Sequence, residues 1–142
     1  MSRTDCTSFA QNALARGEAV VFVDPEPRAD FLRMKLGDKG FTLVRKDVRD
    51  LPGLIDAIKT HGTETVVHTA GLIGGRVQQS LSAAFDINLG GTRNVAEAVR
   101  LTGVRRLVHI SAHPDQLSGI QIILVAPEDE GLLGYSQLLR AR

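Results

Sequence analysis

Cysteine is almost absent from this sequence: Cys6 is the only one among 142 residues. A single thiol excludes an internal disulfide, and without a neighbouring histidine or second cysteine it does not form a metal-binding knuckle, so we assign it no role. No metal-like spacing relates His68 to the other three histidines, His61, His109 and His113. His68 lies in an apolar stretch and is expected to be a hydrogen-bonded core residue. A metal centre is therefore not predicted.

Long apolar runs and an excess of charge are lacking as well. No hydrophobic run approaches the ~20 residues needed to span a bilayer, and the polar start MSRTDCTS lacks the apolar core of a signal peptide. The formal net charge of +1 predicts no attraction to nucleic acid or to a membrane surface. We expect a cytoplasmic protein with neither kind of partner.

The chain alternates between helical and extended patterns, without internal repeats or low-complexity segments. Helices are expected over residues 7–16, 28–36, 51–61, 78–102 and 131–142. Strands are expected over residues 18–23, 41–44, 65–69, 106–110 and 120–125. Short connections between alternating elements predict a mostly parallel sheet wound right-handedly, with helices on both faces. The expected fold is one Rossmann-like three-layer α/β domain spanning residues 1–142.

Two details of this pattern predict close packing. Val66 and Val67 are adjacent and apolar, which predicts a strand buried on both faces. The helix expected over 78–102 contains Gly90 and Gly91, each costing about 1 kcal/mol relative to alanine, so another group is expected to approach closely there. Five apolar residues of this helix are expected to form its packing stripe: Leu81, Phe85, Val95, Ala98 and Val99.

The sequence of residues 65–111 resembles that of the extended short-chain dehydrogenase/reductase family. The resemblance lies in TVVHTAGLIGG and in the later FDINLGGTRNVAEAVRLTGVRRLVHIS. This family contains NAD(P)-dependent sugar epimerases, dehydratases and 3β-hydroxysteroid dehydrogenases. The resemblance implies a dinucleotide bound at the carboxyl ends of the strands. It also implies hydride transfer between nicotinamide and a secondary alcohol or sugar carbon.

Two acidic positions match the cofactor-binding turns of that family. Asp24 ends VVFVD, where an acidic residue would bind the adenosine ribose and favour NAD over NADP; a solvated turn aspartate is the alternative. The positive charge of Arg28 would partly offset this preference, so NADP is left open as the cofactor. In KDVRD, Asp47 and Val48 resemble the turn that meets the adenine ring, and the alternative is a solvated loop of mixed charge.

The small residues after the third predicted strand and the following helix carry the remaining resemblance. Ala70, Gly71 and the adjoining Leu72 match a segment whose backbone approaches the dinucleotide, which only small side chains permit. INLGGTRNVAEA resembles the family signature N-x-x-G-T-x-N. In that signature Asn88 would fix the local backbone and help hold a water or the active-site lysine.

Two features of the family are missing. Only seven mostly polar residues precede Ser8, so the strand and Gly-x-x-Gly-x-x-Gly turn that cradle the pyrophosphate are absent from this chain. The candidate catalytic residues are Ser111 and Tyr135, but the family's Tyr-x-x-x-Lys pair is not intact because Leu139 occupies the lysine position. A second family hydroxyl is replaced by His113. We expect proton transfer to be poor.

The C-terminal segment admits two placements. Residues 120–125 are either the sixth strand in chain order, which requires no rewiring, or a displaced first strand that fills the sheet centre, with Gly131 and Gly134 as surviving glycines. In either placement no residues remain for a substrate-binding domain.

The leading hypothesis is a shortened NAD(P)-dependent epimerase/dehydratase-like domain that binds a dinucleotide and is weak or inactive as an isolated chain. A catalytically silent domain is the alternative, pairing with itself or another subunit through sheet edges or the 78–102 helix. A third possibility is a truncated product whose open sheet centre exposes unpaired backbone groups.

Overall fold

The computed structural model describes residues 3–112 and 120–125. Its helices are α1 (Arg3–Ala15), α2 (Ala29–Leu36), α3 (Leu51–Thr60), α4 (Gly75–Gln79), α5 (Leu81–Phe85), the π-helical segment η1 (Asp86–Gly91) and α6 (Thr92–Thr102). Its strands are β1 (Val20–Val23), β2 (Phe41–Val44), β3 (Thr65–His68), β4 (Arg106–Ala112) and β5 (Ile120–Val125). The predicted alternation of helices and strands is confirmed.

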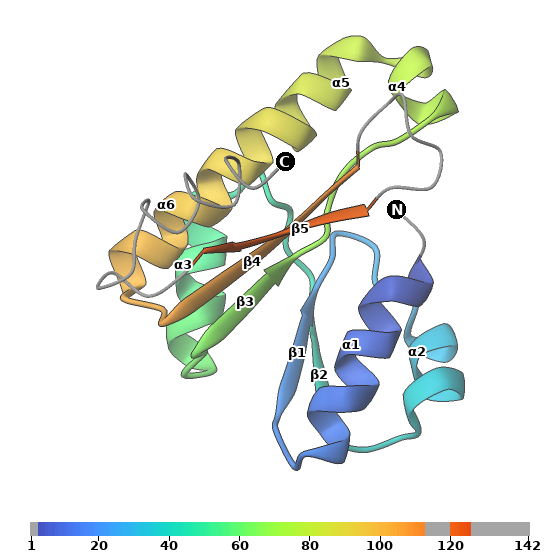
Figure 1. The fold of residues 1–142 in the computed structure, drawn as a ribbon, viewed down its shortest axis with the longest axis vertical. Helices are drawn as coiled ribbons and strands as arrows, with labels where there is room; N and C mark the ends of the chain where they lie inside the picture. The colour runs from blue at the N-terminus through green and yellow to red at the C-terminus, as the bar shows by residue number, and fades with distance from the viewer. Residues whose placement is uncertain (1–2, 113–119, 126–142) are drawn as a thin grey trace, which may run out of the picture.

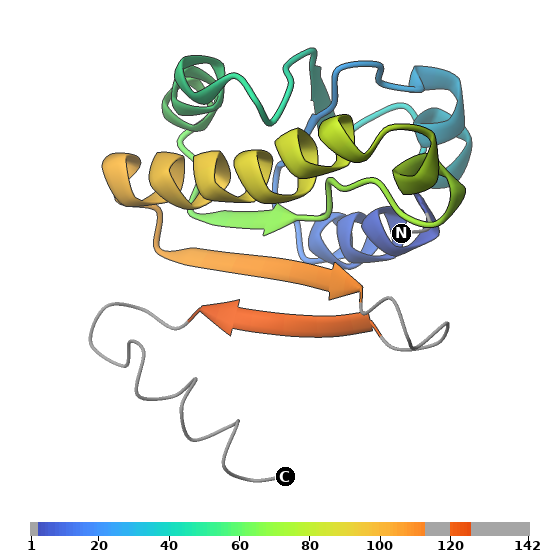
Figure 2. The ribbon, with the colours of Figure 1, turned by 90° about the horizontal axis from the view of Figure 1, so that it is seen from above.

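The strands form two sheets (Figure 1). β1 and β2 are parallel, with Val20 opposite Phe41, and β3 and β4 are parallel, with Thr65 opposite Arg106. Helices α3 and α6 lie on one side of the strands and α1 on the other (Figure 2). This is the layered, mostly parallel Rossmann-like arrangement that the sequence predicts, in incomplete form.

β5 departs from a purely parallel sheet. It pairs antiparallel with β4, Ala112 facing Ile120, on the edge of β4 away from β3. It therefore does not fill the sheet centre, and the displaced first strand is wrong. Its direction also differs from that of a parallel sixth strand, because a parallel crossover needs about a dozen residues or more and only seven separate the two strands.

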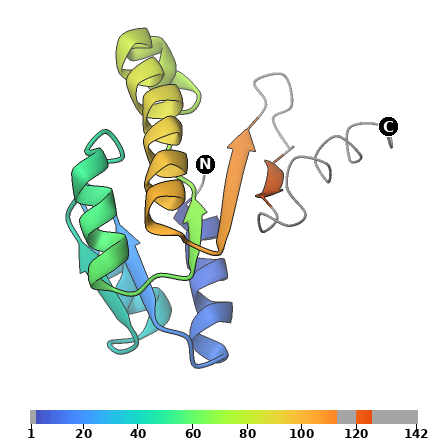
Figure 3. The same ribbon diagram turned by 90° about the vertical axis from the view of Figure 1, so that its left-hand side faces the viewer.

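The two sheets share no paired strand among the described residues. The expectation that Val66 and Val67 are buried on both faces is wrong, since both are only half-buried. β3 has a hydrogen-bonded neighbour on one edge alone in this part of the chain, so its other edge lacks the cover that a central strand receives. Helices α3 and α6 lie side by side (Figure 3). Leu54 of α3 forms a buried cluster with Val95 and Ala98 of α6.

The long helix predicted over 78–102 is interrupted once. Ser80 is extended, and its hydroxyl accepts a hydrogen bond from the N–H of Ala83 at 3.3 Å, which caps α5. From Leu81 the chain runs through α5, η1 and α6 to Gly103. The predicted packing stripe is only partly confirmed: Val95 and Ala98 are buried and Val99 is half-buried, but Leu81 and Phe85 are exposed.

Candidate functional site

The loop after β3 is held by one asparagine. Asn88 Oδ1 accepts from the N–H of Leu72 at 2.7 Å, while its Nδ2 donates to the carbonyl oxygen of Leu72 at 2.9 Å. An amide side chain can do both because it carries a donor and an acceptor. A Cβ on Gly71 would lie 3.2 Å from Asn88 Oδ1, so glycine lets this loop approach η1. The structure therefore brings together predicted residues 70–72 and Asn88.

A second layer of hydrogen bonds supports Asn88 from below. The hydroxyl of Thr92 donates to the Asn88 carbonyl at 2.6 Å and also lies 2.9 Å from His68 Nε2. Since its single proton is used on Asn88, His68 Nε2 is the donor in the second contact. His68 is 4% exposed and its ring stacks on His109, with centroids 4.9 Å apart. The prediction of a hydrogen-bonded core histidine is confirmed.

This histidine pair is kept neutral by its surroundings. Burial, and then the neighbouring His109, lower the pKa of His68 to about 4. Burial also lowers the pKa of His109. The Nδ1 atom of His109 is buried without a hydrogen-bond partner, so protonation there has no acceptor to stabilise it.

The loop after β2 is organised around Asp47. Its Oδ1 accepts from the backbone N–H and the Nε of Arg49, both at 2.9 Å, and its Oδ2 lies 2.7 Å from Arg49 Nη2. The guanidinium lowers the pKa of this carboxyl. Asp47 is thus the anchor of an ordered turn, and its side chain is half-buried.

The same helix that fixes the first loop fixes this one. Asn94 Nδ2 donates to the carbonyl oxygens of Val48 and Arg49, each at 3.1 Å. A Cβ on Gly91 would lie 2.6 Å from Val48 Cγ2, so the close approach predicted for the glycine pair is confirmed at Gly91. Asn94 was not among the predicted site residues, although it is the last residue of the signature N-x-x-G-T-x-N.

Asp24 stands at the end of β1, beside the end of β2. Its N–H donates to Val44 at 3.2 Å, and its Oδ1 accepts from the N–H of Glu26 at 2.7 Å. The turn chemistry expected of an aspartate before proline is therefore present. The hydrogen bond from Glu26 uses Oδ1 of Asp24 and leaves Oδ2 open. Asp24 lies at the same edge of the sheet as the Asp47 turn.

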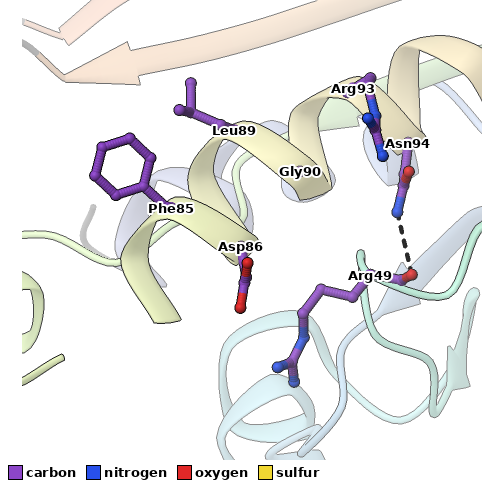
Figure 4. A pocket seen from close by; sticks show the side chains of 7 residues that line it. All are labelled: Arg49, Phe85, Asp86, Leu89, Gly90, Arg93 and Asn94. Carbon is purple, nitrogen blue, oxygen red and sulfur yellow. Dashed lines mark hydrogen bonds between the residues drawn. The ribbon is translucent and has the colours of Figure 1, made fainter. Parts of the chain in front are cut away.

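An open hollow of about 500 Å³ lies between the Asp47 turn, which includes Arg49, and the helix formed by α5, η1 and α6 (Figure 4). Its lining residues are Arg49, Phe85, Asp86, Leu89, Gly90, Arg93 and Asn94. None of these was predicted as a site residue, because nothing in the sequence places the Arg49 turn against the helix. The only sequence signal for this hollow would be the helical spacing of its lining residues: Asp86 and Gly90 are four residues apart, and Gly90 and Arg93 are three apart.

Comparison with known proteins fixes the lineage. Residues 6–117 match the NAD dependent epimerase/dehydratase family. The chain belongs to this family. Human 3 beta-hydroxysteroid dehydrogenase type 7 is 34% identical over 110 residues, which cover 68% of this chain and 29% of that protein. UDP-glucose 4-epimerase of Klebsiella pneumoniae is 30% identical over 105 residues, covering 70% of this chain and 75% of that protein.

Other members of the epimerase/dehydratase family show how far the likeness extends. The UDP-glucose 4-epimerase of Mycolicibacterium smegmatis is 34% identical over 113 residues, which cover 75% of this chain and 34% of that enzyme. The Thermus thermophilus UDP-glucose 4-epimerase structure, a complex with NAD, superposes with a TM-score of 0.60 at 22% identity, covering 95% of this chain and 46% of that one. The chain thus spans about a third of several curated relatives. The structural likeness confirms the Rossmann-like fold.

Several predictions for this family member fall outside the described residues. Ser111 belongs to β4 but its side chain lies outside them, as do Tyr135 and the helix expected over 131–142. In residues 3–112 and 120–125, no group of three or more histidine, cysteine or acidic side chains is placed to hold a metal ion. No helix in this part of the chain is long and apolar enough to cross a membrane.

We expect Asn88→Ala to lower the free energy of unfolding by about 1–2 kcal/mol, because it leaves two backbone groups of Leu72 without partners in a half-buried loop. Urea unfolding followed by circular dichroism measures this. Asn12→Ala, on the exposed surface of α1, is the matched control and is expected to change stability little. Equal effects of the two substitutions would contradict the anchoring role of Asn88.

Proposed function

We propose that this domain binds the adenosine half of NAD at the carboxyl ends of β1, β2 and β3. The observation that carries the proposal is that one continuous helix, η1 and α6, fixes both the loop after β3 and the loop after β2. Asn88 holds Leu72, and Asn94 holds Val48 and Arg49. Loops set in advance by hydrogen bonds lose little freedom when a ligand binds.

Each loop offers chemistry suited to adenosine. The open Oδ2 of Asp24 can accept hydrogen bonds from ribose hydroxyls, and its charge repels the 2′-phosphate of NADP. Asp47 can accept from the adenine amino group while Val48 contacts the ring. The small residues Ala70 and Gly71 let the backbone approach the ligand. Arg28 lies 5.8 Å from the ring centre of Phe31, an interaction that competes with binding of a 2′-phosphate.

The names of several neighbours agree with this assignment. A structure of UDP-glucose-4-epimerase from Stenotrophomonas maltophila contains NAD, and that chain superposes on this one with a TM-score of 0.61 at 23% identity. When bound, NAD would supply the hydride-accepting nicotinamide, while the residues above would orient its adenosine end. We propose binding without turnover, because Leu139 stands where the family has its lysine.

Calorimetric titration with NAD, NADP and adenosine tests this function. We expect NAD and adenosine to bind with similar Kd values, since the proposed contacts all reach the adenosine half, and NADP to bind about 10-fold or more weakly. Asp24→Ala is expected to weaken NAD binding by a similar factor. Asp30→Ala, an exposed acidic residue on α2, is the control. No binding heat and no thermal stabilisation at several millimolar NAD would refute the proposal.

A further inference from the structure

Two strands carry backbone groups that no neighbouring strand uses. In the part of the chain that the structure describes, β1 pairs only with β2, and β3 pairs only with β4. The N–H of Val20 donates to the carbonyl oxygen of Gly40 at 3.3 Å, in the direction of β2. Successive residues of a strand point their backbone groups to opposite edges, so the N–H and C=O groups of Val21 and Val23 point away from β2.

The same alternation applies to β3. The N–H of Arg106 in β4 donates to the carbonyl oxygen of Glu64 at 3.2 Å, so the even-numbered residues of this segment bond to β4. The N–H and C=O groups of Thr65 and Val67 consequently point to the other edge. Neither these groups nor their counterparts in β1 form a hydrogen bond to any residue in the ranges 3–112 and 120–125. Each of the two strands therefore has one open edge.

The two open edges belong to adjacent strands. β1 and β3 are neighbours and run in the same direction in two views (Figure 1 and Figure 3). Helix α1 contacts β1 on one side of the strands, and α6 contacts β3 on the other side (Figure 2). A segment inserted between β1 and β3 would therefore have a strand along each edge and a helix over each face. A strand that is covered on both faces is typically a continuous apolar run.

The side chains of β1 are less buried than their composition predicts. The strand reads VVFV, without the alternation of a half-exposed strand, yet none of its side chains is buried and Val23 is 38% exposed. Val67 of β3 is only half-buried. Apolar side chains and unpaired backbone groups thus occur on the same two strands. An added apolar strand would cover the side chains and form hydrogen bonds with the backbone groups.

An acidic side chain lies at the amino end of the open edge of β3. Glu64 directly precedes β3, is exposed, and forms no salt bridge with any described residue. Because both existing ladders are parallel, a segment parallel to β1 and β3 continues their pattern, and its first residue then lies beside Glu64. A basic residue at that end of the segment complements the charge.

We propose that β1 and β3 together bind an extended segment of another polypeptide, which inserts between them and runs parallel to both. The segment consists of about five uncharged, largely β-branched residues, preceded by a lysine or arginine that pairs with Glu64. Its backbone bonds to the open groups of both strands and joins the two sheets into one. This recognition uses none of the contacts assigned to NAD, so it goes beyond nucleotide binding and does not depend on it.

Amide hydrogen exchange of the full chain locates the binding site. The probe is the peptide acetyl-Lys-Val-Ile-Val-Val-Gly-amide at about 1 mM, without NAD. We expect the amides on the open edges to exchange about 10-fold or more slowly and the Tm to rise by about 5 °C. These are the amides of Val21, Val23, Thr65 and Val67. The amides on the outer edge of β2, Phe41 and Leu43, are the control and stay unchanged.

Three results of this experiment would overturn the proposal. The first is the absence of protection at the open edges of β1 and β3. The second is equal protection at Phe41 and Leu43, which would mean that the peptide pairs with any strand edge. The third is protection in the chain alone that increases with protein concentration, which would mean that a second copy occupies the site.

Backbone N-methylation of the peptide distinguishes insertion between two strands from docking on one. Successive residues of an inserted segment donate hydrogen bonds alternately to β1 and to β3. Methylation of the peptide nitrogen at either the first or the second valine is therefore expected to weaken binding about 10-fold or more, because each removes a bond on one side. If only one of the two methylated peptides binds more weakly, the peptide contacts a single strand and insertion is wrong.

Charge exchange tests the orientation of the segment. Glu64→Lys places like charges together and is expected to weaken binding of the lysine peptide about 3-fold or more, whereas acetyl-Glu-Val-Ile-Val-Val-Gly-amide regains affinity for this variant. Asp56→Lys, the same charge change at an exposed residue of α3, is the control and leaves binding unchanged. Circular dichroism confirms that both variants are folded. Equal effects of the two substitutions would overturn the parallel placement beside Glu64.

Discussion

Gly91→Ala is expected to lower the free energy of unfolding by about 1–3 kcal/mol, whereas Gly90→Ala, one residue earlier, is expected to raise it by about 0.5–1 kcal/mol. The two glycines share a helix and a backbone conformation, but their surroundings differ. The new methyl group at Gly91 would meet Val48 Cγ2 at 2.6 Å and Val48 Cβ at 3.1 Å. At Gly90 it would meet nothing closer than the Phe85 carbonyl oxygen at 4.0 Å, an ordinary contact, and would gain helix propensity.

The cost at Gly91 cannot be relieved easily, because Val48 is β-branched and has few alternative rotamers. Its backbone is also held by Asn94, so the clash displaces the Asp47 turn or the helix. Chemical denaturation of both variants and of the wild-type chain measures the difference. Destabilisation by both alanines to the same extent would mean that helix geometry, not Val48, requires the glycines.

Acidification from about pH 7 to about pH 4 is expected to lower the free energy of unfolding by about 3 kcal/mol through His68 alone. Its pKa in the folded state is about 4, against an ordinary value of 6.5. Above pH 6.5 both states are neutral and the full stability is present. Between these two values the unfolded chain binds a proton that the folded chain does not, so stability falls as the pH falls. The lowered pKa of His109 acts in the same direction.

Urea unfolding at a series of pH values measures this dependence. His68→Gln removes the titrating ring while keeping a donor for Thr92, and is expected to flatten the curve between about pH 6.5 and 4. His61→Gln is the matched control, because His61 is exposed at the end of α3. If the wild-type curve is flat over this range, or if the two variants behave alike, the buried pair is not the source of acid sensitivity.

Local patterns predicted the elements well. The bounds of β2 and β5 agree with the expectation. Glycine and polar residues flank the apolar run of β2, and β5 is the most β-prone stretch of the chain. The start of α3 at Leu51 follows from its helical apolar period and from Asp50, whose carboxylate accepts from the N–H of Gly53 at 3.0 Å. Such signals act over one or two turns, which a single sequence displays directly.

Features that depend on distant partners were harder to predict. Leu81 and Phe85 fit an apolar stripe as well as Val95 does, but only the later part of the helix faces α3, so burial depends on how far α3 extends. The direction of β5 depends on the length of its connection rather than on its own residues. The family resemblance supplied Asn88 and the loop residues 70–72, while the hydrogen bonds of Asn94 to the Asp47 turn emerged only from the packing.

The division of the strands into two sheets has a consequence for how the molecule opens. Hydrogen-bonded ladders connect β1 only to β2 and β3 only to β4 within the described residues, so no continuous ladder transmits rigidity from one half to the other. The halves are joined by the packing of α3 against α6 and by the Asn94 contacts. Native-state opening should therefore occur in two cooperative units, with amides of β1 and β2 exchanging together and those beneath α6 exchanging later.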